Sequence, residues 1–413
     1  MTSPDPYAAT PDYTASSGVA ASRPVAAPEA ATATTMTQGI PLAAQPARGG
    51  AALALGIVGI VIAGVAVLLV VGYLLLSIGP GVFLIGGIMA LVPLAIVVAG
   101  VLWIDRWEPE PRLVLAFAFL WGAGVAVLAA LIVGLEIDAL IQAGGGADPA
   151  FVDFIGSTVQ APIVEEVGKG LAILLIFWVA RAHFDGPVDG IVYAAWVAAG
   201  FAFTENILYF GSQVLDSGTL LSGDVIMIFL VRGLMSPFAH VMFTACTGAA
   251  LGFAARRGVG RAAGVLWWIG GLVPAILLHA FWNGALYFVT DFFAYFFLVQ
   301  FPLFLGVVAI VVALRRQEAK LTRARLAEYA AAGWIHPAEV DVLATPAGRR
   351  LAKAWAARAG RGPLMAAYIR DATRLAFARQ RVITGRDRIG SQADEAMLLQ
   401  RITATRAALG API

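Results

Sequence analysis

Long apolar stretches follow one another from about residue 51 to residue 314, separated by short polar connections. A helix of about 20 apolar residues is long enough to cross the hydrocarbon core of a bilayer. The 413-residue chain is 60% hydrophobic and only 13% charged, which excludes an ordinary soluble globular domain. The sequence therefore predicts an all-α, polytopic membrane protein embedded in a lipid bilayer, with no nucleic-acid partner.

We predict about eight transmembrane helices. The connection around Thr290 and Asp291 is short, so seven spans with one re-entrant segment are an alternative. The predicted spans cover residues 51–77, 81–104, 112–136, 154–180, 187–211, 224–254, 262–289 and 291–314.

Basic residues between the spans lie in alternate connections, and the other connections contain no Lys or Arg. The basic residues are Arg106, Arg112, Arg181, Arg256, Arg257, Arg261, Arg315 and Arg316. Cytoplasmic loops of membrane proteins carry an excess of Lys and Arg. The pattern predicts a multi-pass protein of the plasma membrane with both termini in the cytoplasm.

Composition divides the chain into three regions. Residues 1–48 are rich in Ala, Pro, Thr and Ser, which predicts a disordered cytoplasmic tail. Residues 49–314 form the transmembrane domain. Residues 315–413 become charged and periodic, which predicts a small cytoplasmic helical domain, with a helix start at Thr345-Pro346. Its many arginines favour either a solvated face near anionic lipid or a partner-binding surface.

Several ionisable residues lie inside the apolar spans, where each charged side chain costs roughly 2.5–3.5 kcal/mol on insertion. They are Glu165, Glu166, Lys169, Glu205, Arg232, His240 and His279. Charges in membrane spans mark functional sites. The combination of carboxylates and imidazoles suits acid–base or metal chemistry.

The fourth span carries Glu165, Glu166 and Lys169. On a helix Lys169 can reach either carboxylate, and the two carboxylates point about 100° apart. One glutamate could then face a reaction while Lys169 holds the other. The alternative is a buried ion pair that only fixes helix packing.

The next three spans add further polar groups. Glu205 lies between Thr204 and Asn206 in the fifth span. The sixth span carries polar residues at intervals of four, which share one helix face, and Pro237 should kink the helix just before the third of them. These residues are Arg232, Ser236, His240 and Thr244.

In the seventh span His279 and Asn283 share a face, as a base or ligand beside an oxyanion donor would. For each of these groups the alternative is interhelical hydrogen bonding that serves packing.

At these positions the chain resembles the PrsW family of intramembrane proteases, over roughly residues 81–314. The matching residues are Asp105-Arg-Trp-Glu108-Pro-Glu110-Pro111, Glu165-Glu166 with Lys169, Phe201 with Glu205-Asn206, His240, and His279 with Asn283. This family is similar to the type II CAAX prenyl endopeptidases, but Glu205 stands where those enzymes carry His. The resemblance implies cleavage of membrane-anchored proteins, with site-1-type cleavage of an anti-sigma factor as the implied reaction and a single-span protein as substrate.

For peptide hydrolysis we expect Glu166 or Glu165 to act as general base and Lys169 to position the pair. His240 and His279 would bind a metal ion or the water and oxyanion directly, and Asn283 would support the oxyanion. The expected catalytic residues are Glu165, Glu166, Lys169, His240, His279 and Asn283. The expected metal ligands, with Zn²⁺ as the ion, are Glu166, Glu205, His240 and His279. For Glu205 the alternative is a hydrogen bond that supports one of the histidines. A metal-free, glutamate-dependent mechanism is the alternative.

Three other functions use similar residues. A proton- or ion-coupled transporter also needs intramembrane carboxylates, but the sequence has no internal repeat of the kind that transporters carry. A non-catalytic scaffold would recruit partners through residues 315–413 and tolerate loss of Glu166 or His240. A CAAX-like processing enzyme would work at the cytoplasmic face, whereas Glu205 and His279 are predicted in the outer half of the bilayer.

Overall fold

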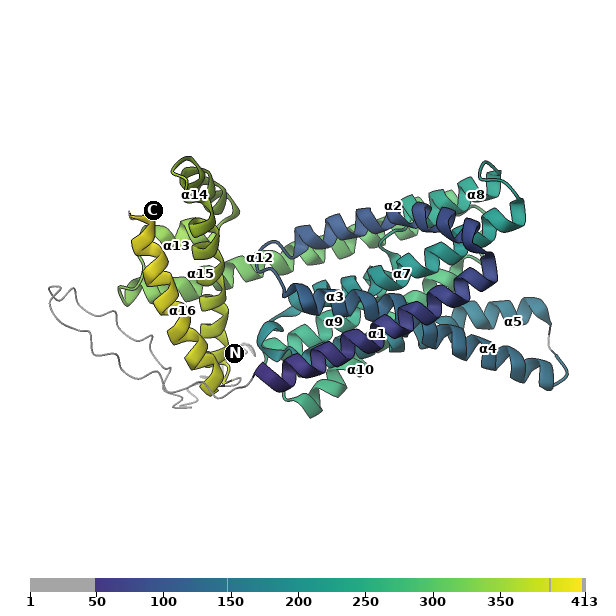
Figure 1. Ribbon diagram of the computed structural model, residues 1–413, viewed down its shortest axis with the longest axis horizontal. Helices are drawn as coiled ribbons and strands as arrows, with labels where there is room; N and C mark the ends of the chain where they lie inside the picture. The colour runs from purple at the N-terminus through teal and green to yellow at the C-terminus, as the bar shows by residue number, and fades with distance from the viewer. Residues whose placement is uncertain (1–48, 147, 386–387, 411–413) are drawn as a thin grey trace, which may run out of the picture.

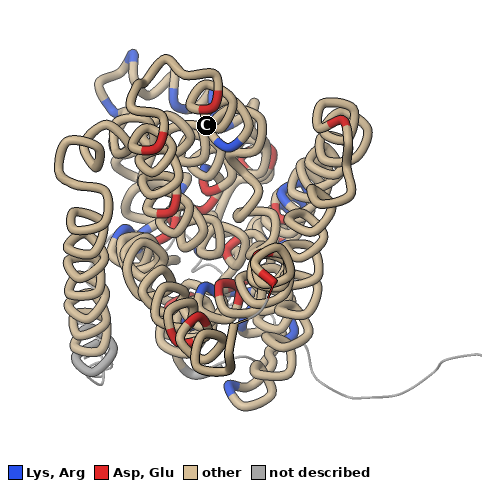
Figure 2. The backbone as a smooth tube through the Cα atoms, turned by 90° about the vertical axis from the view of Figure 1, so that its right-hand side faces the viewer, with Lys and Arg blue, Asp and Glu red and all other residues tan. Residues whose placement is uncertain are grey.

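The computed structural model describes residues 49–146, 148–385 and 388–410, so the predicted tail at 1–48 lies outside the described residues. The described part contains helices and no strand, which confirms the all-α prediction. Long, roughly parallel helices form a bundle, and shorter helices gather beyond one end of it (Figure 1). Seen along the bundle, most of the chain is free of charged residues (Figure 2).

The bundle is built from continuous helices and from helices joined through π-helical turns. Its first half contains α1 (Gly49–Ile78), α2 (Pro80–Ile104), α3 (Arg112–Leu120), η1 (Trp121–Ala126), α4 (Val127–Ala143), α5 (Pro149–Ile155), η2 (Gly156–Gln160) and α6 (Ala161–Val179). After the short 3₁₀ turn η3 (Arg181–His183), its second half contains α7 (Pro187–Ser217), α8 (Gly223–Ile228), η4 (Phe229–Met235), α9 (Ala239–Arg256), α10 (Arg261–Ala285), α11 (Phe292–Tyr295), η5 (Phe296–Gln300) and α12 (Phe301–Ala331).

Seven of the eight predicted spans correspond to helices that are long and apolar enough to cross a membrane. The predicted fourth span is also helical, from Pro149 through α5, η2 and α6 to Val179, but it is not among the seven. The physical reason is its charge, because Glu165, Glu166 and Lys169 lie within five residues. This most polar segment carries the first pair of candidate site residues.

Helix α7 is the most buried of the seven and lies at the centre of the bundle. Glycines let it approach α9 closely. A Cβ atom on Gly190 would collide with the Gly248 carbonyl, and one on Gly248 would collide with the Gly190 carbonyl. Close approach through small residues is the usual way in which membrane helices pack. It brings Glu205 of α7 and His240 of α9 onto neighbouring helices.

The predicted kink at Pro237 is a break in the helix. The π-helical turn η4 ends at Met235, and α9 begins at Ala239. Proline has no N–H to donate and its ring clashes with the preceding turn, which kinks or breaks a helix. Here the helix breaks, whereas α2 and α10 continue through Pro93 and Pro274. The break lies between Arg232 and His240, so the two side chains are no longer related by a regular helix.

The C-terminal region contains α13 (Pro337–Ala344), α14 (Pro346–Arg358), α15 (Gly362–Ile383) and α16 (Arg388–Leu409) around a separate apolar core. The predicted helix start is confirmed, since the Thr345 hydroxyl caps α14 by accepting from the Gly348 N–H at 3.0 Å. Helix α12 runs without interruption through the predicted boundary at residue 315 to Ala331. It links the two regions as one rod of about 46 Å, given a rise of 1.5 Å per residue.

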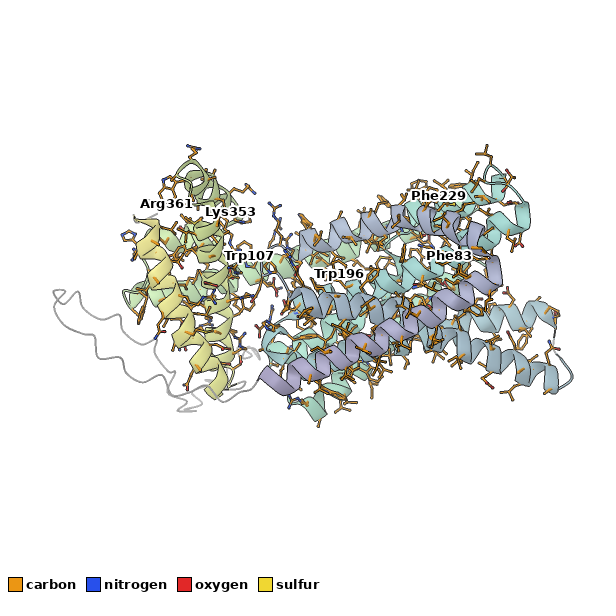
Figure 3. The ribbon with its side chains drawn as sticks, viewed as in Figure 1. Phe83, Trp107, Trp196, Phe229, Lys353 and Arg361 are labelled. Carbon is orange, nitrogen blue, oxygen red and sulfur yellow. The ribbon has the colours of Figure 1, made fainter. Side chains whose placement is uncertain are left out.

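The loop between α2 and α3 inserts into this C-terminal region, where Trp107 lies between the two parts (Figure 3). The guanidinium of Arg349 lies 3.4 Å from the centre of the Trp107 ring and donates to the Trp107 carbonyl at 3.0 Å. The Trp107 indole donates to the Thr322 hydroxyl at 3.2 Å. These contacts attach the C-terminal helices to the bundle.

Candidate active site

Helix α6 places Glu166 and Lys169 one turn apart, and both side chains are fully buried. The Lys169 ammonium lies 2.6 Å from Glu166 Oε1. Glu166 also accepts a hydrogen bond from the His279 ring at Nδ1 (3.1 Å) and one from the Thr244 hydroxyl at 2.9 Å. With three partners from three helices, Glu166 is held rigidly inside the bundle.

Glu165, one residue earlier on α6, has a different environment. Its Oε2 atom is buried and makes no hydrogen bond, although the Lys169 ammonium lies 3.6 Å away. The same oxygen lies 3.9 Å from His279 Nε2 and 4.0 Å from His240 Nδ1. A buried polar atom without a hydrogen bond is costly, by about 1–3 kcal/mol. Glu165 is therefore the less constrained of the two glutamates.

His240 at the start of α9 is oriented by α7. Its Nε2 atom donates to Glu205 Oε2 at 2.9 Å, and Arg232 donates to the same oxygen at 2.5 Å. Arg232 also donates to the Asn206 side-chain oxygen at 3.2 Å and lies 3.8 Å from the Tyr209 ring. Arg232 thus fixes Glu205, and Glu205 fixes the His240 ring.

The two histidines are held in the same way, because one ring nitrogen of each faces a carboxylate. A carboxylate can only accept, so Glu166 and Glu205 hold the proton of each neutral imidazole on the nitrogen that faces them. The lone pairs then lie on His279 Nε2 and His240 Nδ1, the two nitrogens that face Glu165. Lys169 donates to His240 Nδ1 at 3.2 Å.

Glu165, His240 and His279 offer three potential ligand atoms that all lie within 4.8 Å of one another. Two imidazoles and one carboxylate form the donor set of many catalytic zinc sites, in which further carboxylates orient the histidines. This grouping differs from the ligand set expected from the sequence. Glu166 and Glu205 contact the opposite ring nitrogens of the histidines and so occupy the orienting positions.

The remaining predicted residue, Asn283, lies one turn beyond His279 on α10. Its amide Nδ2 donates to the Ser157 carbonyl in η2 at 3.0 Å. The carbonyl is available because η2 is a π-helical turn, where the regular helical hydrogen bonding changes. One N–H of the amide is engaged by that contact, which leaves the second for another acceptor.

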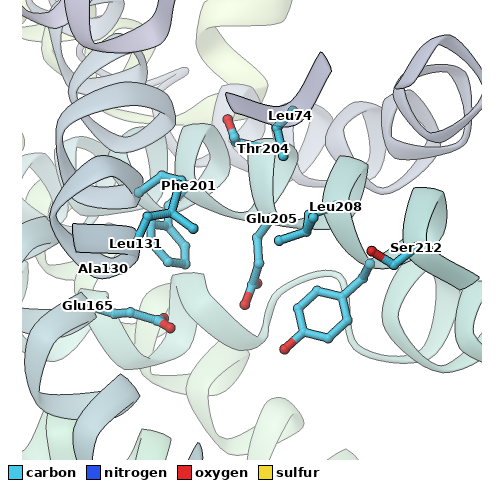
Figure 4. A pocket seen from close by; sticks show the side chains of 11 residues that line it. Leu74, Ala130, Leu131, Glu165, Phe201, Thr204, Glu205, Leu208 and Ser212 are labelled. Carbon is cyan, nitrogen blue, oxygen red and sulfur yellow. The ribbon is translucent and has the colours of Figure 1, made fainter. Parts of the chain in front are cut away.

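A cavity of about 440 Å³ opens beside Glu165 and Glu205. The two carboxylates point into it from α6 and α7, and the Tyr209 ring borders the same space (Figure 4). A second cavity of about 100 Å³ touches the histidines and Asn283 on the other side. The cluster is thus accessible from two cavities although it lies inside the bundle.

Two contributors were absent from the expected catalytic and metal-ligand sets. Thr244 holds Glu166, and Arg232 holds Glu205. Both belong to the row of polar residues at intervals of four in the sixth predicted span, so that spacing was the signal that could have found them. Ser236, the second member of the row, instead donates to the Val231 carbonyl of its own helix at 2.6 Å.

Comparisons with known proteins agree with this geometry. The family model described as PrsW family intramembrane metalloprotease matches residues 110–314. The curated proteins named Protease PrsW from Clostridioides difficile (strain 630) and Bacillus subtilis (strain 168) are 32% identical over 164 residues and 34% identical over 176 residues. A third, from Geobacillus kaustophilus (strain HTA426), is 30% identical over 144 residues. No solved structure matches the chain.

The matches cover 39%, 42% and 35% of this chain and 62%, 70% and 55% of the three relatives. The chain therefore spans little more than half of some relatives and about two thirds of others. The family match begins at Glu110, so Asp105 and Glu108 of the resembling motif precede it. It contains every residue of the carboxylate–histidine cluster, and on this ground the chain belongs to the PrsW family.

Proposed function

We propose that this chain is an intramembrane endopeptidase that hydrolyses a peptide bond of membrane-anchored proteins. One observation carries the proposal. The buried Glu165 Oε2 faces the unprotonated nitrogens of two histidines, and two further carboxylates orient those rings. Lys169 donates to His240 Nδ1, but Glu165 Oε2 makes no hydrogen bond, and electron-rich atoms that face one another inside an apolar bundle need a further cation or proton. That arrangement suits hydrolysis better than helix packing.

The donor set fits a divalent metal, and we propose Zn²⁺ held by Glu165, His240 and His279. Three carboxylates of the cluster face two cations, Lys169 and Arg232, which leaves one negative charge to balance. A bound zinc ion would supply Lewis acidity and a more acidic water molecule.

The chain's own residues supply the remaining parts of the reaction. Glu166 and Glu205 fix the orientation and the tautomer of the histidine rings. Glu165 lines the larger cavity and, as a zinc ligand, would hold the ion beside the attacking water. The second N–H of Asn283 stabilises the oxyanion. In a metal-free version, the histidines hold the attacking water. The Glu165 carboxylate then accepts the proton of that water and delivers it to the leaving amine.

The substrate class follows from the position of the site. A membrane-spanning protein must unwind locally to bring a peptide bond to buried carboxylates. We propose single-span proteins as substrates, an anti-sigma factor among them, and both termini of this chain in the cytoplasm, as the alternation of basic connections indicates.

The test is membrane proteomics of native cells that carry either the wild type or the Glu165→Gln/Glu166→Gln double variant at matched expression. We expect a few single-span proteins to accumulate uncut in the variant alone. Glu136→Gln, which changes an exposed carboxylate on α4, serves as the matched control. Full proteolysis by the double variant would overturn the proposal.

A further inference from the structure

The larger cavity beside Glu165 is apolar over most of its wall. Its apolar residues come from three helices, α1, α4 and α7. They are Leu74, Val127, Ala130, Leu131, Phe201 and Leu208. The polar residues of the wall belong to α6 and α7. They are Glu165, Thr204, Glu205, Tyr209 and Ser212. An apolar pocket with a few convergent polar groups is the usual form of a ligand site.

The surface around this cavity is apolar and exposed. Leu75 on α1, Ile132 and Leu135 on α4, and Leu215 on α7 are exposed large hydrophobic side chains. In a membrane such a surface faces lipid, so the cavity is reached from the bilayer. A third cavity, of about 330 Å³, is lined by apolar residues apart from Thr204. It shares Leu74 and Thr204 with the 440 Å³ cavity and extends the apolar lining between α1 and α2.

We propose that the 440 Å³ cavity is a specificity subsite, which binds a large apolar side chain next to the cleaved bond of a membrane-spanning segment that enters between α1, α4 and α7. The proposal rests on the protease function argued above and adds what the enzyme selects. The volume lies within the range of about 300–1,000 Å³ that small ligands occupy in proteins.

The polar residues of the wall favour a peptide over a lipid acyl chain. An acyl chain would offer no hydrogen bond to Glu165 Oε2, which has none within the bundle, or to the Ser212 hydroxyl. A locally unwound peptide has free N–H and carbonyl groups that need partners inside the bilayer. The carboxylates accept from peptide N–H groups, and the hydroxyls of Tyr209 and Ser212 donate to peptide carbonyls. The apolar wall then receives the adjoining side chain.

Leu131 on α4 is the residue best placed to test the pocket, because its half-buried apolar side chain lines the wall. A larger side chain there should shrink the cavity, and a smaller one should enlarge it. Discrimination by one methylene group in an apolar pocket is about 10- to 200-fold.

The probe is a library of single-span reporter helices with randomised central residues, reconstituted in liposomes with the full-length protein. We expect the wild type to prefer Leu, Ile, Met or Phe beside the cut. Leu131→Trp should lower kcat/KM for reporters with Phe there by about 10- to 200-fold relative to reporters with Ala. Leu131→Ala should instead gain activity on reporters with Trp, a gain that a folding defect cannot produce.

Leu266→Trp, at an exposed position on α10, is the matched control and should leave the preference unchanged. If all variants share the wild-type preference, the cavity is not the specificity subsite. A lipid acyl chain is then its favoured occupant. If the wild type cleaves no reporter above the level of Glu165→Gln/Glu166→Gln, the proposed protease function fails as well. The two failures are therefore distinguishable.

Discussion

Two groups of buried acidic residues use carboxylates in different ways. The membrane cluster contains Glu165, Glu166 and Glu205, whose neighbours are Lys169, Arg232 and the two histidines. The junction cluster lies where the C-terminal helices meet the bundle. It consists of Asp105, Glu108, Glu110, Asp189 and Glu318.

In the junction cluster, Asp105, Glu110 and Asp189 accept from hydroxyl or backbone N–H groups, whereas Glu108 and Glu318 have arginines among their charged neighbours. Asp105 accepts from the Glu110 N–H at 3.0 Å, and Glu110 accepts from the Tyr193 hydroxyl. Asp189 accepts from the N–H groups of Asp185 and Gly186 at 2.6 and 2.8 Å. Burial raises the pKa of Asp105 to about 6 and raises the pKa of Glu110 well above its usual value.

The difference shows what a catalytic carboxylate needs besides burial. In the membrane cluster, imidazole nitrogens and a cavity adjoin the free oxygen of Glu165. In the junction cluster, three carboxylates accept hydrogen bonds within residues 105–193. They lie beside the Arg349–Trp107 contact and the Arg381–Asp185 ion pair, which attach the C-terminal helices to the bundle. We infer that the first cluster supports chemistry and the second supports attachment of the C-terminal region.

The largest expected effect separates the two clusters by activity. Glu165→Gln should lower kcat by about 10²- to 10⁴-fold, the usual contribution of a general acid or base. Glu108→Gln, an equivalent change in the junction cluster, should leave kcat unchanged, because Glu108 is remote from the histidines. Turnover of a single-span reporter in liposomes measures both. Equal losses in the two variants would contradict the separation.

The next effect concerns metal binding. Glu166→Gln and Glu205→Gln each remove a carboxylate that orients a histidine, and such changes weaken metal affinity by about 10- to 100-fold. Titration of zinc against a competing chelator, followed by mass-spectrometric metal analysis, measures the affinity without activity. Glu136→Gln is the control. Wild-type protein that binds no zinc and retains full turnover in the presence of chelator would establish the metal-free version.

The helices and the convergence of the polar groups could be predicted from the sequence because a bilayer tolerates so few charges. Glu165, His240 and His279 stood out in apolar spans, and their distances of 3.9 and 4.0 Å confirm that they meet. The orienting role of Glu166 could not be predicted. Adjacent glutamates differ by about 100° on a helix, and only the rotation of α6 in the bundle decides which one faces the cavity.

The junction was missed for a related reason. Trp107 and Arg349 are 242 positions apart, and no local pattern indicates that a loop and a distant helix will meet. In the sequence, Asp105-Arg-Trp-Glu108-Pro-Glu110-Pro111 contributed only to the family resemblance and indicated no partner for the loop. This contact depends on the direction of α12, which runs from the bundle into the C-terminal region and so sets the position of the C-terminal helices.

A smaller effect tests the attachment. Arg349 is buried and donates to the carbonyls of Leu343 and Trp107 and to the Thr373 hydroxyl, at 2.6, 3.0 and 2.7 Å. Arg349→Ala should destabilise the protein by at least about 1.5–3 kcal/mol, the worth of one hydrogen bond to a charged group, since it removes three of them. We expect faster limited proteolysis of the C-terminal helices and a lower Tm.

The neighbouring Arg350 is exposed on the same helix, so Arg350→Ala is the matched control. Metal affinity of the membrane cluster should be the same in both variants. A loss of zinc binding in Arg349→Ala would show that the two clusters are coupled, and the distinction between chemistry and attachment would then fail.

The smallest effect is the pH dependence of stability at the junction. Because burial raises the pKa of Asp105 from 3.8 to about 6, the folded state binds the proton more tightly than the unfolded state. Stability from this group is therefore present at low pH and is lost as pH rises through 6. Between pH 5.5 and 7.5 the loss is about 1 kcal/mol, and the raised pKa values of Glu108 and Glu110 act in the same direction.

We therefore expect a higher Tm at pH 5.5 than at pH 7.5 in detergent, and a weaker dependence in Asp105→Asn, which keeps an oxygen for the Glu110 N–H but has no proton to bind. Asp138→Asn, at an exposed position on α4, should reproduce the wild-type dependence. A wild-type Tm that rises with pH over this interval would mean that Asp105 is stabilised as an anion. The junction would then resemble the membrane cluster, with its carboxylates held by cations.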